Sequence, residues 1–147
     1  MEILEEQITR MENSAGSAVY ACFLKLLAQS RQTDALYSYF GRFVQMLESE
    51  NAYVRTRGLL FIAANARWDT EYKVDEVIDE YLAHIMDIKP TVSRQMIAAL
   101  PELAAAKPEL APDIRRALQN ANPGRYKDSM APLVQKDIAK ALGEIQI

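Results

Sequence analysis

The chain has 147 residues, half of them hydrophobic and a quarter charged, which is the size and composition of one ordinary soluble domain. Its single Cys and single His exclude a disulfide framework, a cysteine-based zinc or iron–sulfur site and a histidine-rich metal site within one copy. Seventeen Lys and Arg against twenty Asp and Glu give a net charge of −3, which does not favour nucleic acid as a partner.

Hydrophobic spacing predicts helices along almost the whole chain. Apolar residues recur three and four apart, and no stretch alternates polar and apolar residues as a strand would. The helices expected at 52–67 and 90–106 are apolar on nearly all sides, so we expect each of them to pack between neighbouring helices. Helix-breaking residues place about eight helices at 2–12, 14–29, 34–49, 52–67, 71–86, 90–106, 109–120 and 129–145.

Start and stop signals fix several of these boundaries. We expect Thr33 to cap the third helix and Asn51 the fourth, because short polar side chains accept hydrogen bonds from the first N–H groups of a helix. Pro90 suits the first turn of the sixth helix, where its missing N–H costs nothing. Pro101 lies inside the same apolar pattern and should kink this helix without ending it.

The helices repeat in pairs. A shift of 37 residues aligns the fourth helix with the sixth, so that Arg57 falls on Arg94 and Leu60 on Ile97, and a shift of 42 adds the last helix. A period of about 40 residues with two helices is typical of HEAT and armadillo α-solenoids. We therefore expect one all-α domain over residues 1–147, a short right-handed α-solenoid of about four antiparallel helix pairs. A non-repetitive helical bundle is the alternative.

Two segments resemble the second helix of a HEAT repeat. They run from Asn51 to Ala64 and from Lys89 to Pro101, and the resemblance, to small bacterial HEAT-like proteins, covers about residues 14–145. It implies a repeat fold but no particular activity. In HEAT repeats, an Arg at the position of Arg55 commonly pairs with polar groups in the turn between helices.

Three cations are candidates for binding a partner. The repeat alignment places Arg57, Arg94 and Lys136 on equivalent positions of successive helices, which would give a basic stripe along the concave face. The alternative is a structural ladder in which these cations pair with Asp87 and neighbouring polar groups.

Trp68 and Tyr20 complete the set of candidate binding residues. In HEAT proteins of DNA alkylation repair, aromatic residues and an Asp act together on a damaged base, and Trp68 followed by Asp69 resembles that combination. The reading that the sequence favours is structural. Trp68 then plugs the junction between repeats while Asp69 or Thr70 caps the next helix.

No combination of residues indicates catalysis. The residues around His84 offer neither a nucleophile nor an orienting group, and Cys22 lies in an apolar stretch, which favours an inert thiol. The carboxylates of the fifth helix are interpreted as a solvated face: Asp75, Glu76, Asp79 and Glu80. We therefore expect no catalytic residue, no metal and no cofactor.

The function expected from the sequence is a non-enzymatic scaffold that binds a protein or peptide through its concave inner-helix face. The alternative is a nucleic-acid-associated protein related to DNA-alkylation-repair HEAT domains. The acidic N-terminus does not resemble a signal peptide, and no uncharged stretch is long enough to span a membrane, so we expect a cytoplasmic protein without a membrane partner. The partner's identity and the oligomeric state stay open.

Overall fold

The computed structural model describes residues 2–14 and 16–146, which form eight α-helices and contain no strand. The prediction of an all-α fold is confirmed. Short 3₁₀ turns lie next to several helices, and the chain divides into two compact units, Met1–Lys73 and Val74–Ile147. The helices are α1 (Leu4–Asn13), α2 (Ser17–Gln32), α3 (Phe40–Met46), α4 (Ala52–Asn65), α5 (Lys73–Ala83), α6 (Pro90–Ala106), α7 (Ala111–Asn120) and α8 (Ala131–Glu144).

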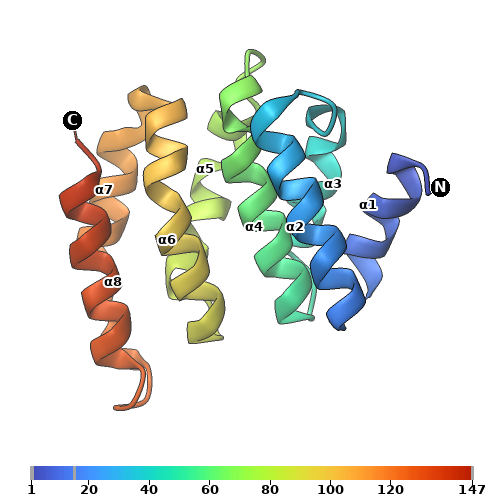
Figure 1. Cartoon of the computed structure of the whole chain (residues 1–147). Helices are drawn as coiled ribbons and strands as arrows, with labels where there is room; N and C mark the ends of the chain where they lie inside the picture. The colour runs from blue at the N-terminus through green and yellow to red at the C-terminus, as the bar shows by residue number, and fades with distance from the viewer. Residues whose placement is uncertain (1, 15, 147) are drawn as a thin grey trace. The chain divides into compact units, whose positions relative to one another are not determined.

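In the first unit, α4 is the central helix. It packs against α1, α2 and α3, and Figure 1 shows α2 and α4 side by side and running in the same direction. The ring of Phe61 on α4 stacks on Phe43 of α3 at a centroid distance of 4.8 Å and meets Phe23 of α2 edge-on at 5.2 Å. The apolar residues around α4 are thus buried on several sides, as its sequence predicts.

The helices α3 and α4 lie very close together at Gly58. A Cβ atom at this position would lie 2.7 Å from the carbonyl oxygen of Phe43 and 2.8 Å from the Cβ of Met46. Both distances are shorter than a van der Waals contact, so only glycine lets the two helices pack at this spacing.

In the second unit, α6 packs against the 3₁₀ segment His84–Met86 that follows α5 and against α8, which lies beside it in Figure 1. Ile138 of α8 is buried, as is Ile145, which directly follows this helix, and Leu142 is half-buried. Lys136 and Lys140 are exposed on the same helix. Burial of one stripe of α8 agrees with the amphipathic pattern of its sequence.

Thr33 does not begin a helix, whereas Asn51 and Pro90 mark helix starts as predicted. Thr33 directly follows α2, and its Oγ1 accepts a hydrogen bond from the N–H of Ala35. Residues 34–49 do not form one helix. They form turns, the 3₁₀ segment Tyr37–Tyr39 and the short α3. Asn51 does cap α4, with its Oδ1 2.8 Å from the backbone nitrogen of Tyr53. Pro90 begins α6, which continues through Pro101 to Ala106.

Candidate functional site

Arg57 lies in the core of the first unit. Its side chain is almost fully buried, and its Nη1 donates hydrogen bonds to the carbonyl oxygens of Met11 and Ser14 at 3.0 and 2.5 Å. Burial lowers the pKa of Arg57 from its ordinary value. These carbonyls belong to the C-terminal end of α1, where a cation also interacts favourably with the helix dipole. Arg57 therefore fastens α1 to α4, and its assignment as a partner-binding residue is corrected to a structural one.

Arg55 has the role that the HEAT resemblance implies. It is buried, and its Nη1 donates to the carbonyl oxygens of Ser49 and Glu50, at 3.0 and 3.2 Å, in the turn that precedes α4. Arg55 and Arg57 therefore hold two different segments against the same helix.

Arg94 lies at the surface of the second unit and joins α6 to α8. Its Nε donates to Oδ2 of Asp137 at 2.6 Å, and this bond raises the pKa of Arg94. Asp87, the expected ladder partner, has its carboxylate bonded to Nδ1 of His84 at 2.7 Å and to the N–H of Lys89 at 2.9 Å. The sequence alignment could have indicated this ion pair. It pairs Arg94 with Lys136, and Asp137 directly follows Lys136.

The three aligned cations thus have three different environments. Arg57 is buried on backbone carbonyls, Arg94 is half-exposed and ion-paired, and Lys136 is exposed. Arg94 and Lys136 keep surface positions, both in the second unit.

Trp68 and Asp69 take structural positions at the end of α4. The indole nitrogen of Trp68 donates to the carbonyl oxygen of Ser30 at 2.7 Å, and the side chain is half-buried. Oδ1 of Asp69 accepts the N–H of Lys73, the first residue of α5, at 2.9 Å, so Asp69 satisfies a free N–H at the start of this helix from four residues before it. The hydroxyl of Tyr37, which the sequence did not single out, also donates to Asp69 at 2.6 Å, and burial followed by this bond raises the pKa of Tyr37.

Two of the exposed aromatic residues of the first unit, Tyr20 and Tyr53, lie in the first turns of α2 and α4. Tyr20 is 59% exposed and Leu24, one turn later on the same face of α2, is 45% exposed. Tyr53, in the first turn of α4, is 69% exposed. Because α2 and α4 pack together and run in the same direction, their first turns lie at the same end of the unit (Figure 1). We call Tyr20, Leu24 and Tyr53 the tyrosine face.

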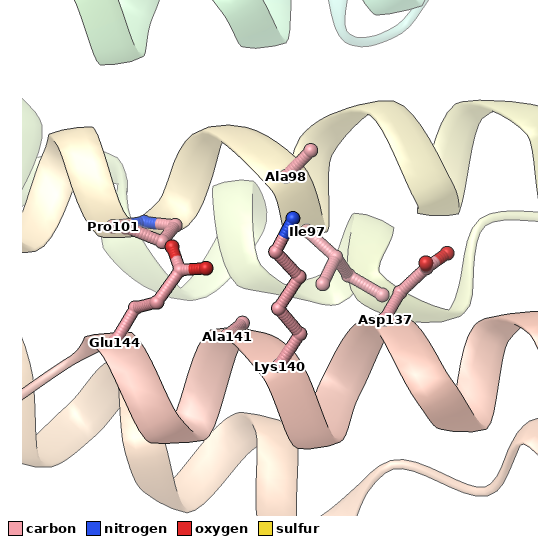
Figure 2. Close-up of a pocket in the computed structure, with 7 residues that line it drawn as sticks. All are labelled: Ile97, Ala98, Pro101, Asp137, Lys140, Ala141 and Glu144. Carbon is pink, nitrogen blue, oxygen red and sulfur yellow. The ribbon is translucent and has the colours of Figure 1, made fainter.

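The second unit has a shallow pocket between α6 and α8 (Figure 2). Ile97 and Ala141 contribute to its lining, and the side chains of Lys140 and Glu144 extend from α8 toward α6. Its volume is about 100 Å³, compared with about 300–1,000 Å³ for typical ligand pockets. The pocket therefore has room for a few water molecules or part of a side chain.

His84 and Cys22 lie in different units of the chain. Asp87 orients the ring of His84, which the neighbouring sequence did not reveal, but no nucleophile is found bonded to this ring within the described residues. Cys22 is half-buried on α2, in the other unit. Across residues 2–14 and 16–146, no three His, Cys, Asp or Glu side chains are grouped to hold a metal ion. No helix in this part of the chain has both the length and the apolar character needed to cross a bilayer.

No protein family, curated protein or solved structure matches this chain.

Proposed function

We propose that this chain is a non-enzymatic, HEAT-like repeat scaffold that binds a protein or peptide partner through the second helices of its pairs. The helix pairing within each unit supports this proposal. The helices α2 and α4 lie side by side in the first unit, and α6 and α8 do so in the second, as second helices of neighbouring repeats do.

The tyrosine face is the observation that carries the proposal. Tyr20 and Tyr53 are both more than half exposed, although each has a large apolar ring. Tyrosine is enriched at protein interfaces because its rigid ring buries a large area while its hydroxyl keeps a hydrogen bond. Leu24 extends this apolar surface along α2, which suits a peptide that presents hydrophobic side chains.

Three arginines of the first unit do not favour the nucleic-acid alternative. Arg55 and Arg57 are buried on backbone carbonyls, and Arg42 is bonded to Glu5 and Glu12 of α1. Nucleic-acid binding needs accessible cations that contact phosphates and displace the counterions of the nucleic acid. These three arginines are already engaged by the fold.

Display selection of peptides against the intact protein tests this function. We expect selected peptides to bind the Tyr20→Ala, Tyr53→Ala double variant about tenfold or more weakly than the unmodified chain, as interface tyrosines commonly do. Leu133→Ala is the matched control, because Leu133 is also exposed but lies on α8. Peptides that bind the double variant as tightly as the unmodified protein would place the binding surface elsewhere.

A further inference from the structure

The turn between α5 and α6 presents an isoleucine to solvent. Ile88 is 84% exposed, more than any other large hydrophobic residue that the structure describes. Its neighbours in the chain are the buried Asp87 and the exposed Lys89. Burial of an apolar side chain of this size against a partner is favourable, because it removes apolar surface from water.

Three hydrogen bonds hold this turn in place. One carboxylate oxygen of Asp87 accepts the N–H of Lys89 at 2.9 Å, and the other lies 2.7 Å from Nδ1 of His84. The hydroxyl of Tyr126 donates to the carbonyl oxygen of Asp87 at 2.5 Å. Ile88 therefore projects from a fixed backbone, so that binding through it costs little conformational entropy.

Tyr126 also brings a second, basic loop to this turn. Its neighbours Arg125 and Lys127 are exposed, as is Lys89. None of these three cations forms an ion pair with another described residue. Asp128 is the exposed carboxylate of the same loop, so the local balance is positive.

The helix directions add to this positive potential. Both α6 and α8 begin at this end of the second unit (Figure 1). Their N-cap residues, Lys89 and Met130, supply no side-chain cap. Each helix N-terminus carries a partial positive charge that attracts anionic groups, and here both ends lie near the exposed cations.

We propose that Ile88, Lys89, Arg125 and Lys127, called here the Ile88 end, dock an acidic protein segment that carries large apolar side chains between its carboxylates. Ile88 contacts the apolar side chains, and the three cations pair with the surrounding carboxylates. This surface is on a different unit from the tyrosine face and does not depend on it.

A protein segment fits these observations better than an anionic membrane. One isoleucine buries little area in a bilayer, whereas stable surface binding needs an extended apolar face or a lipid anchor.

Fluorescence anisotropy with a synthetic probe tests the proposal. The probe is a labelled Glu-rich peptide with Leu at every third position, and the control peptide carries Ser in place of Leu. We expect the Leu peptide to bind about tenfold more tightly than the Ser peptide, and its binding to weaken as salt rises. Ile88→Ser should remove this preference, and the triple change Lys89→Gln, Arg125→Gln, Lys127→Gln should remove the salt dependence.

Ile3→Ser and Lys25→Gln are the matched controls, because both residues are exposed in the first unit. They should leave peptide binding unchanged. Equal binding of the two peptides, or full binding by the Ile88→Ser variant, overturns the proposal. Binding to vesicles of phosphatidylserine and phosphatidylcholine through Ile88, without binding of the Leu peptide, also overturns it and identifies a membrane surface instead. Unchanged melting temperatures show that each variant is folded.

Discussion

Buried cations of this chain are held by oxygen atoms from distant parts of the same unit. Arg57 binds the carbonyls that end α1, and Lys107, which is almost fully buried, places its Nζ 2.8 Å from Oδ1 of Asp75 in the first turn of α5. A buried charge is tolerated only when such partners replace water. The sequence shows the cations but not these partners, since the partners become neighbours only after the helices pack.

Substitution of Arg57 tests this role. We expect Arg57→Gln to lower the free energy of unfolding by about 2–3 kcal/mol, because two buried carbonyl oxygens lose their charged donor. Chemical denaturation measures the loss. Arg116→Gln, at an exposed pair with Asp113, is the control and should leave the denaturation midpoint unchanged. Equal midpoints for the two variants would contradict the structural role of Arg57.

Tyr81 should make the protein sensitive to alkali. It is fully buried, and burial followed by the nearby charge of Glu102 raises the pKa of Tyr81 above its ordinary value. The folded state then favours the neutral phenol, while the unfolded chain ionises near pH 10. Stability is therefore complete below about pH 10 and falls as pH rises toward the folded pKa. Melting temperatures across this range should fall less steeply for Tyr81→Phe than for the unmodified protein, and parallel slopes would contradict the effect.

At the scale of elements, the contact between α3 and α4 depends on Gly58. We expect Gly58→Ala to destabilise the protein by about 1–3 kcal/mol, because the new Cβ meets a backbone carbonyl that cannot move without shifting α3. Gly41→Ala on α3 is the control, since nothing lies within 4 Å of a Cβ there. It should be neutral or stabilise by up to about 1 kcal/mol. Thermal melts of both variants measure these stability changes. An unchanged melting temperature for Gly58→Ala would contradict the close contact between α3 and α4 at this position.

The last helix covers the apolar side of α6. Val134, Ile138 and Ile145 are buried in the second unit, so removing residues 129–147 would expose the apolar surface that they cover. We expect the truncated chain to aggregate or to unfold without cooperativity. Size-exclusion chromatography with a thermal melt measures both properties. A monomeric truncation with an unchanged melting temperature would show that α8 contributes little to the unit.

For the whole molecule, the sequence predicted elements better than contacts. The periodic apolar residues and the Asn51 cap placed α4 correctly, since both signals are local. Residues 34–49 were wrongly predicted as one helix, because their apolar spacing is helical although the chain turns at Tyr37–Tyr39. Periodicity reports which side of a segment is buried and does not report where a short segment bends.

The surroundings of the aligned cations were predicted less well, for a physical reason. Alignment by repeat treats equivalent positions as equally exposed, but Arg57 is buried beneath α1 whereas Arg94 meets Asp137 at the surface. The sequence did not predict that Tyr53 is exposed. Exposure of a tyrosine depends on the packing around the start of its helix, and the neighbouring residues in the sequence do not specify that packing.

Site-specific photo-crosslinking tests the central claim, that the tyrosine face binds a protein partner. A photoreactive phenylalanine analogue replaces Tyr20, Tyr53 or, as a control, Leu133, each of which is exposed. After irradiation in native lysate, mass spectrometry identifies the attached chains. We predict that positions 20 and 53 capture the same protein and that position 133 does not capture it. Capture of that protein equally from all three positions, or from none, would contradict the claim.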